Sequence, residues 1–195
     1  MSDTRKNIRL GWIGTGVMGL AMCGHLMDAG YPLTVFNRTA AKLRPLVERG
    51  AKPAASAKEV GAASDIVFSM VAYPADVEAV SIGPDGALAG MRPGSVLCDM
   101  STSSPTLAAR IAEQAAQKDV IGMDAPVTGG DVGAKEATLA IFVGGARPGF
   151  ERLLPCLEAM GRKIMYCGAA GMGQQAKLAK RLRSEERRVG KECRS

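Results

Sequence analysis

A glycine-rich turn close to the start of the chain has the spacing of a phosphate-binding loop. It consists of Gly14, Thr15, Gly16, Val17, Met18 and Gly19. In this G-x-G-x-x-G pattern the first glycine permits a tight turn, the second lets the backbone approach a pyrophosphate, and the third lets a helix pack closely on a strand. The turn follows a short apolar segment, and a helix after it would point free N–H groups at the phosphates. We therefore expect a dinucleotide cofactor here, with a purely structural glycine turn as the alternative.

The end of the next predicted strand bears on which dinucleotide is bound. A site for NAD usually carries Asp or Glu about twenty residues beyond the glycine turn, where the carboxylate bonds the ribose hydroxyls. This chain has no carboxylate there and instead reads Asn37, Arg38 and Thr39. Asn37 can still bond the ribose, and Arg38 can pair with a 2′-phosphate through charge-assisted hydrogen bonds. The sequence therefore favours NADP(H) over NAD(H), unless Arg38 is only a solvated loop charge.

Few side chains in the sequence could transfer a proton to a bound substrate. His25 is the only histidine, and its place beside the glycine turn favours a half-buried helix residue over an acid–base in a substrate cleft. The Tyr-x-x-x-Lys pair of short-chain reductases is absent, because no lysine follows a tyrosine at that spacing. The nucleophile elbow G-x-S-x-G and a cluster of metal-ligating residues are missing too. A lysine remains as the proton carrier, and no metal is expected.

The elements that would hold these residues alternate along the chain. Apolar runs with glycine or proline stops predict strands at 8–13, 33–36, 65–71, 95–99, 120–124, 139–143 and 164–167. Helices are predicted between them, at 18–29, 40–49, 60–63, 105–118 and 150–160, and another begins at Gln174. Strands that alternate with helices pair in parallel through right-handed crossovers. We expect an α/β fold, a doubly wound Rossmann domain with a mostly parallel sheet.

The chain divides into three expected segments. Residues 1–169 fit one NAD(P)-binding Rossmann domain, and residues 170–182 fit the start of an interdomain helix. Residues 183–195, Arg-Ser-Glu-Glu-Arg-Arg-Val-Gly-Lys-Glu-Cys-Arg-Ser, resemble the conceptual translation of a common short-read sequencing adapter. Such a non-native tail is set aside when a fold is inferred. We therefore expect the natural sequence to stop near Leu182 and the gene product to continue elsewhere.

Bulk composition bears on the class of protein and on its partners. Of the 195 residues, 47% are hydrophobic and 23% charged, which is typical of a globular protein. No apolar run approaches the roughly 18 residues of a membrane helix, and the N-terminus lacks a signal-peptide core, so we expect a cytoplasmic protein without membrane contact. The net charge is +6, of which the tail supplies +2, so nucleic-acid binding is not inferred. The five scattered cysteines suggest neither disulfides nor zinc.

Three ordered motifs, with a further short match at 99–102, make the chain similar to a known family. The glycine turn has a Met before its third glycine, 99–102 reads Asp-Met-Ser-Thr, 124–130 reads Asp-Ala-Pro-Val-Thr-Gly-Gly, and 171–178 reads Gly-Met-Gly-Gln-Gln-Ala-Lys-Leu. Together they resemble the β-hydroxyacid dehydrogenase family, which includes 3-hydroxyisobutyrate dehydrogenase and tartronate semialdehyde reductase. The resemblance extends from residue 8 to about residue 178.

The resemblance implies roles for residues in these motifs. Lys177 stands where the family has its catalytic lysine, which would protonate a carbonyl oxygen as hydride arrives from the nicotinamide, and remove the proton in reverse. Thr128, Gly129 and Gly130 would hold a substrate carboxylate with N–H groups and a hydroxyl. Thr102 would contact the cofactor. The implied activity is an NADP-preferring interconversion of a small 3-hydroxy acid, or 2-hydroxy acid, and its oxo or semialdehyde acid.

Two departures from the family pattern qualify this expectation. The family has an asparagine four residues after the lysine, where it helps hold substrate, whereas this chain has Arg181 there with Lys180 before it. Family members also continue into a helical C-terminal domain that completes the substrate pocket and forms the dimer interface. We expect that domain to be missing here, this fragment to be inactive, and the full-length protein to be a homodimer or homotetramer.

Two other functions remain open. The chain could be a non-catalytic NADP-binding module that senses cofactor or serves as a scaffold. It could also resemble an imine reductase, which shares the architecture but replaces the lysine with another proton donor. The presence of Lys177 counts against both.

Overall fold

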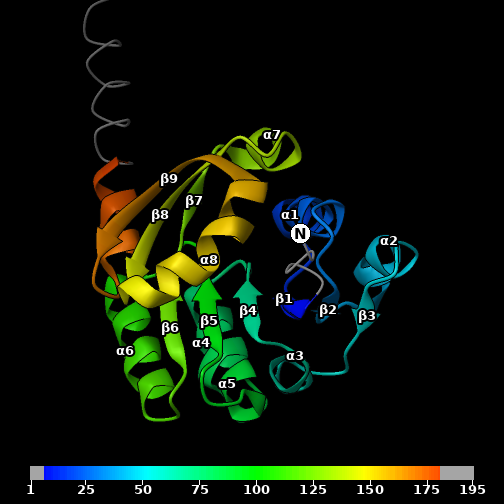
Figure 1. Cartoon of the computed structure of the whole chain (residues 1–195), viewed down its shortest axis with the longest axis horizontal. Helices are drawn as coiled ribbons and strands as arrows, with labels where there is room; N and C mark the ends of the chain where they lie inside the picture. Colours follow the sequence, from blue (N-terminus) through cyan, green and yellow to red (C-terminus); the bar gives the residue numbers. More distant parts are fainter. Residues whose placement is uncertain (1–6, 181–195) are drawn as a thin grey trace, which may run out of the picture.

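One mixed sheet runs through the molecule, and the computed structural model describes it over residues 7–180 (Figure 1). Its strands are β1 (Leu10–Ile13), β2 (Leu33–Phe36), β3 (Lys52–Pro53), β4 (Ile66–Ser69), β5 (Val96–Asp99), β6 (Ile121–Asp124), β7 (Val127–Thr128), β8 (Leu139–Gly145) and β9 (Gly161–Gly168). The helices are α1 (Val17–Asp28), the 3-10 helix η2 (Ala40–Leu43), α2 (Arg44–Val47), α3 (Ala57–Ala63), α4 (Pro74–Ile82), α5 (Ala87–Gly90), α6 (Pro105–Ala116), α7 (Gly130–Lys135) and α8 (Arg147–Met160). A further helical segment covers residues 172–180.

The parallel part of the sheet has its connections reversed at β1. The parallel strands lie in the order β3-β2-β1-β4-β5-β6. Trp12 of β1 is aligned with Val35 of β2 on one side and with Phe68 of β4 on the other. The chain therefore leaves β1 toward one edge of the sheet and later returns to build toward the other edge. Ligands of doubly wound folds bind outside the carboxyl ends of the strands at such a switch point. The topology alone thus marks the turn after β1 as a binding place.

The far part of the sheet departs from the expected pairing. β8 is antiparallel to β6 and β7, where Asp124 is aligned with Gly144 and Val127 with Ile141, and β9 is parallel to β8. We expected strands that alternate with helices to pair in parallel, and for β8 that is wrong. The short α7 turns the chain back without the long crossover that a parallel connection requires. The sheet as a whole is mostly parallel, as predicted.

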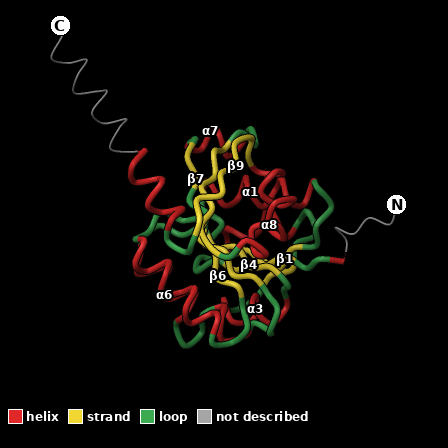
Figure 2. Tube along the Cα trace, turned by 60° about the vertical axis from the view of Figure 1, so that its left-hand side comes forward, coloured by secondary structure: helices red, strands yellow, loops and turns green. Residues whose placement is uncertain are grey.

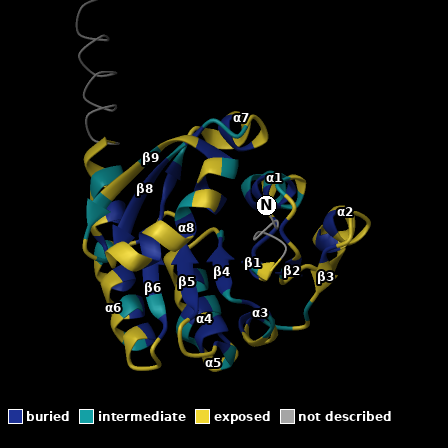
Figure 3. Cartoon of the chain, in the orientation of Figure 1, coloured by how far each residue is buried: buried dark blue, intermediate teal, exposed yellow. Residues whose placement is uncertain are grey.

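Helices cover both faces of the sheet, as Figure 2 shows for α1 and α8 on one side and α3 and α6 on the other (Figure 2). Successive side chains of a strand point to opposite faces. Trp12 accordingly packs in one core with Met22 of α1 and Leu153 of α8, whereas Ile13 packs in a second core with Leu107 of α6. The central strands are buried on both faces (Figure 3), which explains why they appear in the sequence as continuous apolar runs.

The elements that sequence reasoning missed are short or begin at polar residues. β2 coincides with its predicted range, but α4 was not predicted, although it starts with Pro74 and has Asp76 in its first turn, both of which favour a helix start. The short β3, α5, β7 and α7 were missed as well. The predicted tail at 183–195 lies outside the described residues, and the division into segments 1–169 and 170–182 stays a prediction.

Two global features follow from the described residues. Within 7–180 no helix is long and apolar enough to cross a membrane. Cys23, Cys98 and Cys156 are buried free thiols and Cys167 is a half-buried one, while Cys193 falls outside the described range. Burial raises the pKa of the Cys23 and Cys98 thiols well above the ordinary value, which keeps them protonated and unreactive.

Candidate functional site

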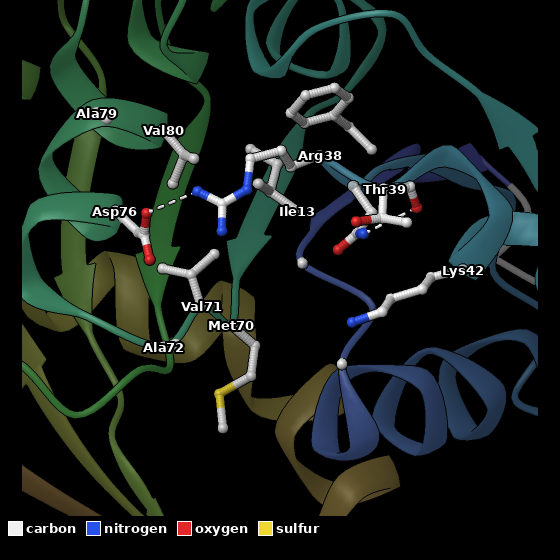
Figure 4. Close-up of a pocket in the computed structure, with 14 residues that line it drawn as sticks. Ile13, Arg38, Thr39, Lys42, Met70, Val71, Ala72, Asp76, Ala79 and Val80 are labelled. Carbon is white, nitrogen blue, oxygen red and sulfur yellow. Dashed lines mark hydrogen bonds and ion pairs between the residues drawn. The ribbon is translucent and has the colours of Figure 1, made fainter.

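A cavity of about 360 Å³ opens where the carboxyl ends of β1, β2 and β4 meet the start of α4 (Figure 4). Five residues predicted to bind cofactor line it: Gly14, Gly16, Asn37, Arg38 and Thr39. The other residues of the glycine turn, Thr15, Val17, Met18 and Gly19, adjoin them in the chain, and α1 starts at Val17. The structure thus brings the glycine turn and the end of β2 together at the topological switch point.

The glycines of the turn have different reasons to lack a side chain. Gly14 has a φ of +95°, and a Cβ there would lie 2.2 Å from the carbonyl oxygen of Met70. A Cβ on Gly19 would lie 2.0 Å from the carbonyl oxygen of Gly14, so this glycine lets α1 sit against the turn. A Cβ on Gly16 would meet nothing within 4 Å. The space beside Gly16 is therefore open, which fits a backbone that a pyrophosphate must approach.

Asn37 holds the turn in place rather than standing free at the end of β2. Its side-chain oxygen accepts a hydrogen bond from the backbone N–H of Thr15 at 3.0 Å, and its Nδ2 donates to the carbonyl oxygen of Thr39 at 3.0 Å. Thr15 is buried, and its hydroxyl donates to the carbonyl oxygen of Lys42 at 3.4 Å. The Thr15 side chain thus points into the protein, and its part in any cofactor site is to shape the turn.

Two basic side chains reach the cavity from the segment after β2. Arg38 is 88% exposed, and its guanidinium pairs with the Asp76 carboxylate at 3.4 Å across the cavity. Lys42 also lines the cavity, and Figure 4 shows its amine directed toward the glycine turn. Sequence reasoning singled out Arg38 but missed Lys42 and Asp76. A second cation four residues after Arg38 was the available signal for Lys42.

A second cluster lies at the carboxyl ends of β5 and β6. The Lys177 amine donates to the Thr102 hydroxyl at 2.5 Å and to the carbonyl oxygen of Val127 at 2.7 Å. Thr102 follows β5, and Val127 begins the β7 strand that leads into Gly129 and Gly130. Three predicted site segments therefore converge, although they are separated in the sequence.

The turn predicted to bind substrate is open and depends on glycine. Gly129 and Gly130 have φ values of +136° and +65°, a region that favours glycine. A Cβ on Gly130 would meet nothing within 4 Å, and both glycines are exposed. Thr128 is half-buried beside them at the end of β7. A small polar ligand could approach the backbone N–H groups of this turn.

Asp124 fixes the helical segment that carries Lys177, a role that sequence reasoning missed. One carboxylate oxygen accepts from the N–H of Gly171 at 2.7 Å, and the other accepts from the N–H of Gln174 at 2.8 Å. Burial raises the pKa of the Asp124 carboxyl, and these backbone hydrogen bonds partly offset the rise. A carboxylate bound to the first N–H groups of a helix is favoured by the helix dipole. Its position as the last residue of a predicted strand was the available signal.

Asp99 joins the ends of β4 and β5. Its Oδ1 accepts hydrogen bonds from the hydroxyl of Ser69 at 2.8 Å and from the hydroxyl of Ser101 at 2.7 Å. The Ser101 oxygen in turn accepts from the backbone N–H of Val71 at 2.9 Å. Burial raises the pKa of the Asp99 carboxyl, while the serine hydrogen bonds act in the opposite direction. This network shapes the loop that presents Thr102.

His25 has a structural contact away from the cavity. It is half-buried on α1, and its Nε2 lies 2.8 Å from the carbonyl oxygen of Ala134 on α7. The contact joins the helix after the glycine turn to the helix that begins at Gly130. Among residues 7–180 no group of three or more His, Cys, Asp and Glu side chains is arranged to hold a metal ion.

Comparisons with known proteins agree with this geometry. Residues 9–168 match the family described as the NAD binding domain of 6-phosphogluconate dehydrogenase. A protein of Arabidopsis thaliana named probable 3-hydroxyisobutyrate dehydrogenase-like 1, mitochondrial, is 51% identical over 180 residues, which are 92% of this chain and 54% of that protein.

Two solved structures are similar in fold and in sequence. The Mycobacterium tuberculosis 3-hydroxyisobutyrate dehydrogenase with L-serine is 35% identical with a TM-score of 0.83, and the match covers 89% of this chain and 58% of that one. The protein Psf3 in complex with NADP⁺ and 2-OPP is 30% identical with a TM-score of 0.83, over 88% of this chain and 61% of that one. The chain thus spans between half and two thirds of the length of these relatives.

Proposed function

The chain belongs to the β-hydroxyacid dehydrogenase family through its NAD binding domain of the 6-phosphogluconate dehydrogenase type, and on this premise we propose that the full-length protein is an NADP-preferring oxidoreductase. It interconverts a small 3-hydroxy acid, or 2-hydroxy acid, and the corresponding oxo or semialdehyde acid. The observation that carries this proposal is the Lys177 amine, which joins Thr102 to the start of the substrate turn.

The residues around the cavity fit a nicotinamide dinucleotide. The open space beside Gly16 leaves room for a pyrophosphate, and the first N–H groups of α1 have no partner within the helix and can bind its oxygens. Asn37 and Thr39 line the part of the cavity that would face the ribose. When bound, the nicotinamide group donates or accepts the hydride. All other steps fall to side chains and backbone groups of this chain.

The preference for NADP(H) rests on charge at the end of β2. Arg38 and Lys42 both line the cavity, and no carboxylate stands at 37–39 to bond two ribose hydroxyls. A 2′-phosphate would replace Asp76 as the partner of Arg38 with a more highly charged one. The relative with NADP⁺ bound supports this preference, whereas the name of the matching domain mentions NAD alone.

The substrate side of the proposal concerns a small carboxylate. Thr128, Gly129 and Gly130 offer a hydroxyl and exposed backbone N–H groups on an open turn, which suits a carboxylate. The Mycobacterium tuberculosis relative contains L-serine, a small hydroxy acid of this kind. Binding the carboxylate here would direct the rest of a short substrate toward Lys177.

Lys177 acts as the acid in reduction and as the base in oxidation. Its amine has a fixed place because Thr102 and the carbonyl oxygen of Val127 accept two of its hydrogen bonds. An ammonium group has three N–H donors, and in the complex one of them would be given to the substrate oxygen. In reduction that donor transfers its proton to the carbonyl oxygen, and in oxidation the neutral amine takes the hydroxyl proton.

Several properties belong to the whole protein and stay predictions. The full-length protein is a homodimer or homotetramer in the cytoplasm and binds neither nucleic acid nor membranes. The Arabidopsis thaliana relative is named as mitochondrial, so the location should be measured rather than inferred. This chain alone binds cofactor weakly and turns over little or nothing.

The direct test is an assay of the full-length protein encoded by the gene. NADPH and NADH oxidation are followed with a panel of small semialdehyde acids and glyoxylate, and the hydroxy acids are tested in reverse. We expect turnover with at least one substrate and a higher kcat/KM with NADPH. Binding of NADPH without turnover of any substrate would leave a non-catalytic binding module and overturn the proposal.

A further inference from the structure

The side chain of Gln174 makes two hydrogen bonds to backbone groups. It is fully buried, with 0% of its surface exposed. Its Oε1 accepts a hydrogen bond from the backbone N–H of Ser103 at 2.9 Å, and its Nε2 donates to the carbonyl oxygen of Ser101 at 2.8 Å. These two backbone groups belong to the residues on either side of Thr102. A single side chain therefore fixes the backbone before and after the hydroxyl that contacts Lys177.

The chemistry of the two partners requires an amide in one orientation. The N–H of Ser103 can only donate, and the carbonyl oxygen of Ser101 can only accept. A methionine of similar shape satisfies neither group. A glutamate can accept from Ser103 but, when ionised, has no donor for Ser101. The contacts of Gln174 are therefore specific to glutamine among side chains of this length.

Gln174 and Lys177 act on the same loop from one face of a helix. They are three residues apart, and residues at that spacing lie on the same side of a helix. Gln174 holds the backbone around Thr102, while the Lys177 amine bonds the Thr102 hydroxyl. The backbone N–H of Gln174 is itself held by Asp124. The helix, β6 and the Thr102 loop are thus joined at one residue.

We propose that Gln174 is a positioning residue that sets the place of the Lys177 amine relative to Thr102 and the substrate turn. The inference rests on the proposed acid–base role of Lys177. Gln174 does not touch the reacting atoms. Without its amide, the Thr102 loop is free to move from the helix, and the amine spends less time bound to Thr102 and Val127.

The test compares matched variants of the full-length protein. Gln174→Met removes both hydrogen bonds, and Gln174→Glu removes the one to Ser101 when its carboxyl group is ionised. Gln175→Met is the control, because Gln175 is exposed on the same helical segment. Lysines are acetylated with a limiting amount of acetic anhydride, and mass spectrometry gives the rate at Lys177 relative to the exposed Lys163. NADPH affinity, kcat and thermal unfolding are measured on the same samples.

We expect Lys177 to be acetylated roughly fivefold faster in both Gln174 variants. A change of this size corresponds to the loss of one ordinary hydrogen bond from the Lys177 amine. We expect kcat to fall by about tenfold or more, because small displacements of a catalytic group are costly, while NADPH affinity is kept. The Gln175→Met control should match the wild type in all three. If Gln174→Met does not fold, Gln174→Glu decides the outcome.

Two results separate this inference from the proposed function. Wild-type acetylation and wild-type kcat in the folded Gln174 variants would overturn the positioning role, even if Lys177→Ala abolishes turnover. Wild-type turnover in Lys177→Ala would instead remove the acid–base role. Faster acetylation of Lys177 in the Gln174 variants would then still support the contact that holds the amine.

Discussion

The side-chain oxygen of Asn37 accepts a hydrogen bond from the backbone N–H of Thr15 at 3.0 Å. Thr15 lies within the glycine turn after β1, and Asn37 directly follows the neighbouring strand β2. One hydrogen bond thus couples the turn that would receive the pyrophosphate to the loop that would receive the ribose. A residue predicted to bind the cofactor directly also shapes the rest of the cofactor site.

Replacing Asn37 with alanine should weaken NADPH binding without unfolding the protein. One hydrogen bond of this kind contributes about 1 kcal/mol, so we expect the Kd to rise about fivefold. Isothermal titration calorimetry with NADPH measures the change, and Asn7→Ala, an exposed asparagine ahead of β1, is the control. Equal affinities of the two variants would show that the Thr15–Asn37 contact does not support the site.

Alanine at Gly16 should weaken NADPH binding, whereas alanine at Gly19 should lower the stability of the fold. Gly16 has an ordinary φ of −69°, and its added Cβ meets nothing within 4 Å, so stability should change by less than about 0.5 kcal/mol. The methyl group would occupy space needed by the pyrophosphate, and NADPH affinity should fall at least about tenfold. Urea unfolding and NADPH titration of each variant give the two numbers.

At Gly19 the added Cβ would lie 2.0 Å from the carbonyl oxygen of Gly14. Overpacking of this kind costs about 1–3 kcal/mol, so Gly19→Ala should lower the free energy of unfolding by at least about 1 kcal/mol. A Gly19→Ala variant as stable as the wild type, or a Gly16→Ala variant with normal NADPH affinity, would contradict the geometry of the turn.

Arg38 should determine how much more tightly the protein binds NADPH than NADH. Hydrogen bonds to charged groups contribute about 1.5–3 kcal/mol, so Arg38→Leu should weaken NADPH binding by roughly tenfold to a hundredfold and leave NADH binding almost unchanged. The control is Arg44→Leu, an exposed arginine that pairs with Glu48. Affinities for both cofactors are compared in one titration series. A parallel loss for NADH and NADPH would exclude recognition of a 2′-phosphate by Arg38.

The buried Asp99 carboxyl predicts a dependence of stability on pH. Its folded-state pKa is raised by burial, so the folded protein holds this proton more tightly than the unfolded chain does. The stabilisation is complete below the unfolded pKa of about 3.9 and is lost as pH rises through the higher folded-state value. Asp99→Asn should remove this contribution. Its stability relative to wild type should therefore increase from pH 4 upward.

Urea unfolding of wild type and Asp99→Asn at about pH 4.5 and pH 7.5 measures this difference. Asp85→Asn, on an exposed turn, serves as the matched control. The prediction fails if the difference in free energy of unfolding between wild type and Asp99→Asn is the same at both pH values.

Much of the fold could be predicted because buried parallel strands appear in the sequence as continuous apolar runs. β1, β4 and β5, each buried along its whole length, were predicted close to their observed bounds for this reason. An apolar run does not reveal strand direction. β8 was predicted as a strand, but its antiparallel direction was missed because its residues are as apolar as those of a parallel strand. The helix α4 was missed although Pro74 and Asp76 mark its start.

Sequence patterns pointed to the parts of the candidate site in which one residue type serves one common purpose. Glycines at set spacing and a lysine within a distinctive motif gave the turn at Gly14 and the amine of Lys177. The supporting residues were not predictable in the same way, because Asp124 and Gln174 act through backbone groups that only the fold brings near. Asn37 was assigned to the ribose, and its contact with Thr15 depends on how β1 and β2 are aligned.

Lys177 is proposed to transfer the proton in a reaction carried out at this site. The most direct measurement is the kcat of Lys177→Ala in the full-length protein, together with its Kd for NADPH. General acid–base groups contribute about 10²–10⁴-fold, so kcat should fall by at least about a hundredfold while the Kd changes by less than about threefold. Turnover close to that of the wild type, with NADPH still bound, would exclude Lys177 as the group that transfers the proton.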